Sequence, residues 1–115
     1  MTEGKFSTNG ILFDVNSDQI KPQSYGSLQD IAALLKENAG LRVTIIGHTD
    51  ADGNDAANLE LSKRRALSVA KALTTTFGID ASRMETNGKG KNEPVDSNDT
   101  PAGKANNRRV EFIKL

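Results

Sequence analysis

The feature that most constrains the fold is a short apolar strand pattern that leads, through one turn, into a long helical pattern. Residues 41–48 are rich in Val, Ile and Thr, which favours a buried strand. Residues 59–77 place apolar side chains at helical spacing, with Asn54 or Asp55 as the expected N-cap and Gly78 just beyond the end. A strand joined to so long an amphipathic helix predicts a strand-helix-strand unit within a sheet.

Further strand and helix patterns lie on both sides of that unit. Strands are expected at residues 11–15, 83–86 and 108–115, and helices at residues 24–38 and from Thr100-Pro101 onward. Glycines 88 and 90 and the proline at 94 predict an extended loop that continues to residue 100. This order predicts an α/β (α+β) fold, a two-layer sandwich whose βαβαββ-type mixed sheet has its helices packed on one face.

The length of the chain is sufficient for one hydrophobic core. A domain of 115 residues buries roughly two-thirds of the surface that its unfolded chain exposes. We expect residues 1–10 to be a lead and residues 11–115 to be the domain. No apolar run reaches the length that spans a bilayer, so the sequence suggests either a cytosolic protein or a piece cut from a longer one.

Charge and cysteine content narrow the possible functions. The 15 basic residues balance the 15 acidic ones, and aromatic residues make up only 4% of the chain, so the sequence lacks the basic, aromatic-rich surface typical of nucleic-acid binding. The absence of cysteine excludes disulfides and thiol chemistry. No carboxylate pair or cluster of metal ligands indicates an enzyme, and no cofactor is expected.

Two opposite charges are the most specific chemical feature. Asp50 follows the strand at residues 41–48, where ligands often bind in open α/β sheets. Arg65 lies seven residues after Asn58 on the helix, so their side chains share a face about 10.5 Å apart along the axis, together with Leu61. A fixed anion that faces a fixed cation suits a zwitterionic ligand. Asp50 and Arg65 fit an ordinary ion pair or two solvated surface charges equally well.

Other polar residues near this pair in the predicted fold could serve either the site or the structure. Arg108 has the strand parity of Val110 and would lean toward the helix-covered face, where it could join the site. Alternatively it only closes the sheet edge or pairs with a helix carboxylate. Arg109 should face away. His48, the only histidine, is expected to be a hydrogen-bonded residue at a strand end. The acidic turn after Asp50 begins like a calcium loop, but the sixth and twelfth residues are not the glycine and the glutamate that such a loop requires.

Several spaced motifs together resemble the peptidoglycan-binding domains of the OmpA C-terminal type, which also occur in peptidoglycan-associated lipoproteins and flagellar stator proteins. The resemblance extends from about Ile11 to Ile113. The matching segments are Phe13-Asp14-Val15-Asn16-Ser17, Gly47-His48-Thr49-Asp50 with Gly53, Asn58, Leu61-Ser62 with Arg65-Ala66, Gly78-Ile79-Asp80 with Arg83, Gly88-Lys89-Gly90 with Pro94, and Asn107-Arg108-Arg109-Val110-Glu111.

The resemblance implies a non-enzymatic domain that binds the peptidoglycan stem peptide, chiefly its diaminopimelate residue. Asp50 would accept the ligand ammonium and Arg65 would clamp the adjacent carboxylate through charge-assisted hydrogen bonds. The other implied site residues are Asn16, Asn58 and Arg108 as pocket lining, and Asp14 as a backbone or indirect contributor. The alternative is a structural or protein-protein interaction module in which Asp50 and Arg65 form a stabilising ion pair.

The resemblance also implies a place in the cell envelope. It predicts a periplasmic domain of an outer-membrane-associated protein that anchors this protein to the cell wall. A barrel, lipid anchor or other domain would precede Met1, and membrane contact would come only through that part. The oligomeric state stays open.

Overall fold

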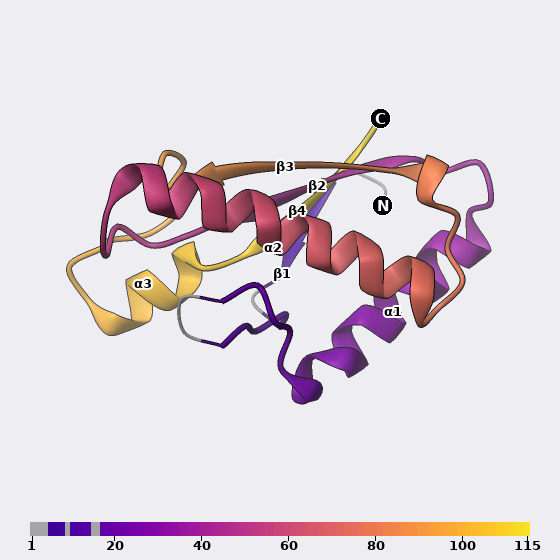
Figure 1. Ribbon diagram of the computed structural model, residues 1–115, viewed down its shortest axis with the longest axis horizontal. Coiled ribbons are helices and arrows are strands. Elements are labelled where there is room, and N and C mark those ends of the chain that lie inside the picture. Colours follow the sequence, from indigo (N-terminus) through magenta and orange to yellow (C-terminus); the bar gives the residue numbers. More distant parts are fainter. Residues whose placement is uncertain (1–4, 9, 15–16) are drawn as a thin grey trace.

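A four-stranded mixed sheet forms one layer of the molecule (Figure 1). The computed structural model describes residues 5–8, 10–14 and 17–115. The strands lie in the order β1 (Lys5–Thr8), β4 (Val110–Lys114), β2 (Val43–His48) and β3 (Met84–Gly90). β4 is antiparallel to both β1 and β2, whereas β2 and β3 are parallel. The parallel pair is the one that a helix must connect, as the sequence predicts for the unit that begins at residue 41.

Helices form the second layer. α1 (Tyr25–Glu37) and α2 (Asp55–Thr75) run along one face of the sheet, and α3 (Pro101–Asn107) lies beyond the end at which β2 and β3 finish (Figure 1). Short 3₁₀ turns at Pro22–Ser24 and Ala81–Arg83 precede α1 and β3. These elements confirm the predicted mixed α/β sandwich. No helix within the described ranges has the length and apolar character needed to cross a membrane.

The core lies between the sheet and the two long helices. β2 is central and five of its six residues are buried, which accounts for its run of Val and Ile side chains. The alternation in β4 puts Val110 and Phe112 against the helices. The core side chains are contributed by every layer: Ile11, Leu28, Ile31, Ala32, Leu35, Val43, Ile45, Ala66, Val69, Ala72, Leu73, Ile79, Val110 and Phe112.

β3 is longer than the sequence predicts, because two of its glycines serve packing and not a loop. A Cβ built on Gly88 would lie 2.5 Å from the backbone nitrogen of Lys63, and one on Gly90 would lie 3.1 Å from the Cα of Leu59, both in α2. Gly90 donates its N–H to the Ser62 hydroxyl at 3.0 Å. The strand therefore continues under α2 to Gly90, four residues beyond its predicted end.

The N-terminal strand is not where the sequence predicts it. Within residues 11–14, Phe13 makes only an isolated bridge to Ile20, and β1 supplies the sheet edge instead. The segment pairs locally, since Leu12 donates to the Ser24 hydroxyl at 2.7 Å and Lys21 donates to the Leu12 carbonyl at 2.8 Å. The predicted strand residue Val15 and site residue Asn16 lie outside the described residues. The predicted domain boundary at residue 11 stays a prediction; β1 lies before it.

Candidate functional site

A cavity of about 470 Å³ lies where the end of β2, the first half of α2 and the start of β4 meet. Residues 11–13 form a further wall. The sequence analysis placed Asp50, Asn58, Arg65 and Arg108 near one another, and all four line this cavity together with Leu61. The β2-α2 connection thus brings a strand-end carboxylate opposite a helix face that carries a guanidinium.

Asp50 is a buried carboxylate with two fixed partners. Its residue is 7% exposed. One carboxylate oxygen, Oδ2, is paired with Nη1 of Arg108, and the other, Oδ1, accepts the backbone N–H of Asp52 at 3.0 Å. In the described part of the chain no ion pair joins Asp50 to Arg65. The ion-pair alternative is therefore wrong about the partner, since the cation that neutralises Asp50 is Arg108.

Arg65 is anchored by backbone carbonyls. Its Nε donates to the carbonyl of Ser17 at 2.8 Å and its Nη2 to the carbonyl of Asp14 at 3.3 Å. The guanidinium carbon lies 4.8 Å from the centre of the Phe13 ring, within cation-π range. Burial lowers the pKa of Arg65 from its ordinary value, and the Asp50 carboxylate opposes that shift. The guanidinium stays charged, and Arg65 lines the cavity.

Of the three remaining implied site residues, Asn16 lies outside the described residues, and Asp14 and Asn58 differ in what they contact. Asp14 is exposed, and its recorded contact with the site is the backbone carbonyl that receives Arg65. Asn58 donates its side-chain amide to the carbonyl of Asp52 at 2.7 Å, so it ties the turn after β2 to α2. Gly53 permits that turn with a φ of 88°.

His48 at the end of β2 and Arg109 just before β4 also line the cavity, but their side chains bond to groups other than Asp50. His48 is 3% exposed, and its Nε2 is hydrogen-bonded to the Glu111 carboxylate, which confirms the prediction of a hydrogen-bonded strand-end histidine. Burial and the nearby Arg109 lower the pKa of His48, although Glu111 opposes the shift. Arg109 donates to the carbonyl of Glu93 at 2.8 Å and is directed away from Asp50, as its strand parity predicts.

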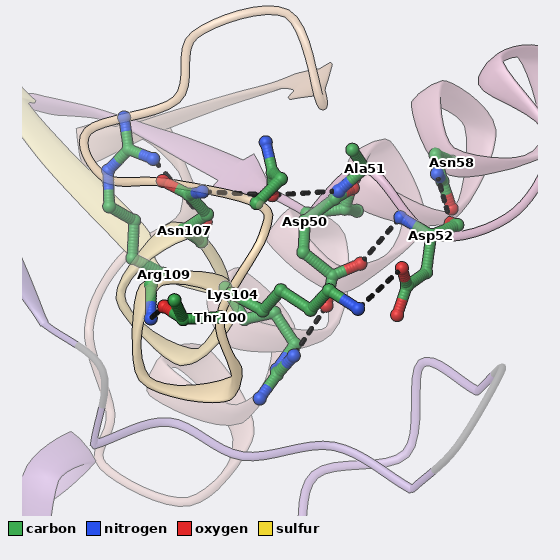
Figure 2. A network of polar contacts seen from close by, with 12 residues as sticks. Asp50, Ala51, Asp52, Asn58, Thr100, Lys104, Asn107 and Arg109 are labelled. Carbon is green, nitrogen blue, oxygen red and sulfur yellow. Dashed lines mark hydrogen bonds and ion pairs between the residues drawn. The ribbon is translucent and has the colours of Figure 1, made fainter.

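The sequence analysis did not identify the residues that hold the turn after Asp50 from the α3 side. Figure 2 shows this network of polar contacts around Asp50, Ala51 and Asp52, with Lys104 and Asn107 beside it. Lys104 pairs with Asp52, its Nζ 3.1 Å from the carboxylate. The available signal was the i,i+4 spacing of Lys104 in α3 and Arg108 at its C-cap, which brings two cations to the acidic turn at Asp50 and Asp52.

Metal binding has no support among the described residues. Within residues 5–8, 10–14 and 17–115, no group of three or more His, Asp or Glu side chains is arranged to hold a metal ion. The cavity instead holds a buried carboxylate, Asp50, that is paired with Arg108, and a second guanidinium, Arg65, that is bonded to backbone carbonyls; these fixed charges suit recognition of a charged ligand.

Comparison with known proteins places the chain among envelope proteins. The OmpA family matches residues 12–108. The chain is 47% identical over 104 residues to the probable lipoprotein YiaD of Escherichia coli (strain K12), which covers 90% of this chain and 47% of that protein. It is 38% identical over 101 residues to outer membrane porin F of Pseudomonas aeruginosa, which covers 88% of this chain and 29% of that protein. The chain thus spans about half or less of these relatives.

Solved structures share the fold over nearly the whole chain. The peptidoglycan-associated lipoprotein from Burkholderia pseudomallei has a TM-score of 0.81 at 32% identity, and the match covers 95% of this chain and 89% of that one. The cell wall anchor of the T6SS from Pseudomonas aeruginosa has a TM-score of 0.79 at 31% identity, with 96% and 78% covered.

Proposed function

Because the chain belongs to the OmpA family, whose domains are non-catalytic modules that bind peptidoglycan, we propose that its cavity binds the diaminopimelate residue of the stem peptide. As a domain of this family it anchors an envelope protein to the cell wall from the periplasm. The observation that supports the proposed ligand is the buried Asp50 carboxylate beside two guanidinium groups in one cavity.

The free end of diaminopimelate carries an ammonium and a carboxylate on one carbon atom. Each carboxylate oxygen of Asp50 has two lone pairs. Oδ1 receives the N–H of Asp52 and Oδ2 pairs with the Arg108 guanidinium, so a lone pair on each oxygen can accept a hydrogen bond from the ligand ammonium. The pre-existing contacts hold the carboxylate in place before the ligand arrives. Preorganisation of this kind reduces the ordering that binding would otherwise require.

Arg65 can receive the ligand carboxylate through the part of its guanidinium that the backbone leaves open. A guanidinium has five N–H donors, and the carbonyls of Ser17 and Asp14 occupy two of them, on Nε and Nη2. Nη1 and the second hydrogen of Nη2 form the end edge, which matches the two oxygens of a carboxylate. The proposed clamp is therefore end-on, and the carbonyls of Asp14 and Ser17 hold the guanidinium in place.

Arg108 gives the proposed site a second cation that is partly exposed. Its side chain is 48% exposed although its partner Asp50 is buried. When the ligand ammonium shares Asp50, the guanidinium of Arg108 can remain paired and still approach the ligand carboxylate from the opposite side to Arg65. Two cations and one anion would then surround one zwitterion.

Charge-conserving and charge-removing variants at the two clamp residues test the proposal. Titration of a diaminopimelate-containing muropeptide into Asp50→Asn and Arg65→Lys should show affinities roughly 10- to 100-fold weaker than wild type, because each substitution removes a charge-assisted contact of about 1.5–3 kcal/mol. Asn retains the Oδ1 acceptor for Asp52, and Lys retains the positive charge. The matched controls are Asp30→Asn and Arg64→Lys, which change exposed residues outside the cavity lining and should bind like wild type.

Two outcomes separate ligand binding from a structural role of the same charges. Unchanged muropeptide affinity in both Asp50→Asn and Arg65→Lys would contradict the site assignment. If the two substitutions lower the melting temperature while the protein still sediments fully with purified cell wall, the charges serve the fold and the interaction-module alternative is the better account.

A further inference from the structure

The segment formed by α3 and residues 91–100 positions the Asp50 carboxylate, and the hydrogen bonds of Asn98 and Asn107 carry this effect. We propose this role for two asparagines that do not line the cavity. The inference rests on the proposed function in one respect, namely that Asp50 contacts the ligand. It concerns how that contact is kept in place.

Asn107 is the buried centre of the arrangement. The residue is 0% exposed at the end of α3. Its Oδ1 accepts the backbone N–H groups of Val95 at 2.7 Å and Asp96 at 3.0 Å, and its Nδ2 donates to the Asp96 carbonyl at 3.0 Å and to Oδ1 of Asn98 at 3.0 Å. Both donors and both acceptor positions of the amide are therefore used. Such a fully satisfied buried amide fixes the conformation of the loop that it contacts.

Asn98 links Asn107 to the turn after β2 through two hydrogen bonds. Its Oδ1, which accepts from Asn107, also accepts the backbone N–H of Ala51 at 3.1 Å. Ala51 directly follows Asp50, so a continuous path of hydrogen bonds runs from α3 to the residue beside the buried carboxylate (Figure 2). Among the described residues, Oδ1 of Asn98 is the acceptor of the Ala51 N–H.

Further contacts hold the same turn from the same side. Lys104 pairs with the Asp52 carboxylate, and Arg108, which follows α3, pairs with Asp50. α3 also packs tightly on the loop, since a Cβ built on Gly103 would lie 1.9 Å from the carbonyl oxygen of Ser97. The helix and the loop therefore form one unit that contacts three consecutive residues of the turn, from Asp50 to Asp52.

Loss of the Asn98 bond should displace the carboxylate and not merely loosen a surface loop. The Ala51 N–H would lose its acceptor, and the turn after Asp50 would relax. The same turn contains the N–H of Asp52, which is hydrogen-bonded to Oδ1 of Asp50 and holds that carboxylate in place. Recognition by fixed charges tolerates errors of only about 0.5 Å in the position of the contacting group. The expected consequence is weaker binding through Asp50, with little change at the Arg65 side of the cavity.

A double-mutant cycle on wall binding tests the inference. Binding of wild type, Asn98→Ala, Asp50→Ala and the double variant to purified diaminopimelate-containing peptidoglycan would be measured by sedimentation over a range of wall concentrations. Asn98→Ala should weaken binding about fivefold or more in the wild-type background and less than twofold in the Asp50→Ala background, because the effect acts through that carboxylate. Asn98→Asp keeps the accepting oxygen and should bind within twofold of wild type.

Controls separate positioning from a general loss of structure. Asn92→Ala makes the same change in the same loop, at a side chain with no hydrogen bond recorded in the described part of the chain, and should leave binding unchanged. Amide hydrogen exchange should accelerate at Ala51 in Asn98→Ala while exchange in β2 and α2 stays as in wild type. Gly103→Ala, which moves α3 off Ser97 without altering a cavity-lining side chain, provides a second route and should also weaken binding.

The possible failures are distinguishable. If Asp50→Ala weakens wall binding and Asn98→Ala weakens it equally in both backgrounds, or in neither, the positioning role is overturned and the proposed ligand site stands. If Asp50→Ala itself has no effect, the proposed site fails and the positioning role fails with it. If binding is equal on walls with diaminopimelate or lysine, the ligand assignment alone fails, and the cycle still decides the role of Asn98.

Discussion

Replacement of Gly47 by alanine tests whether the close approach of α2 to the sheet sets both stability and the geometry of the site. The added Cβ would lie 2.3 Å from the Ser62 carbonyl oxygen, about 1 Å short of the 3.4 Å at which ordinary van der Waals contact begins. The obstacle is backbone, so no side-chain rotation relieves it. Overpacking of this kind costs about 1–3 kcal/mol, and at about 4 °C per kcal/mol for this length the melting temperature should fall by ~4–12 °C.

The same displacement should weaken binding, because α2 carries Asn58 and Arg65 while Gly47 is on the strand that leads to Asp50. A shift of ~1 Å between the two sides of the clamp should reduce muropeptide affinity by roughly tenfold or more, since recognition by fixed charges tolerates only about 0.5 Å. Thermal unfolding followed by circular dichroism and muropeptide titration at a temperature where the variant is folded measure the two effects.

A second glycine provides a control of opposite sign. Gly26 lies in α1 with no atom within 4 Å of an added Cβ, so Gly26→Ala should raise the melting temperature by up to a few degrees through helix propensity, worth about 1 kcal/mol or less, and leave affinity unchanged. The reasoning about close packing would be refuted if Gly47→Ala unfolds at the wild-type temperature and binds the muropeptide as tightly as wild type.

Three further outcomes concern stability. Arg83→Ala removes three hydrogen bonds to carbonyls at and after the end of α1 and should lower the melting temperature by about 10 °C, for a loss of roughly 2–3 kcal/mol, in a thermal scan. Burial lowers the pKa of His48, which is bonded to Glu111, below its ordinary 6.5. The unfolded chain therefore binds a proton at His48 more readily than the folded chain, and the free energy of unfolding should fall as the pH drops below about 6.5. The urea midpoint measured from pH 7.5 to 5.5 should fall less in His48→Gln than in wild type. Asn54→Ala removes the α2 cap and should cost about 1 kcal/mol by urea denaturation.

The elements that the sequence predicts best are those whose own residues determine them. The long helix begins at an Asn54 cap and ends before Gly78, whose φ is 74°, and both signals are local. β3 was predicted too short because glycine signals a loop in isolation, and only the position of Ser62 above Gly88 shows that a strand needs glycine there. The alternating residues 11–14 have the pattern of a strand but bond to Ser24 and Lys21, which no pattern within the segment indicates.

Four of the six predicted site residues, Asp50, Asn58, Arg65 and Arg108, line one cavity, but their contacts were less predictable. Helical spacing puts Asn58 and Arg65 on one face, and strand parity brings Arg108 to the same side as Asp50. Spacing could not reveal that Arg108 is the partner of Asp50, because that choice depends on where α3 ends. Nor could it reveal that backbone carbonyls hold Arg65, since a carbonyl is present at every residue.

The most direct test of the proposed ligand compares two muropeptides that differ at the third stem residue. Lysine lacks the terminal carboxylate that diaminopimelate would present to Arg65, while both residues have the amino group for Asp50. Calorimetric titration of the wild-type protein should give roughly 100-fold tighter binding of the diaminopimelate form, the equivalent of about 3 kcal/mol for a bidentate charged contact. Equal affinity for the two muropeptides would contradict the central claim.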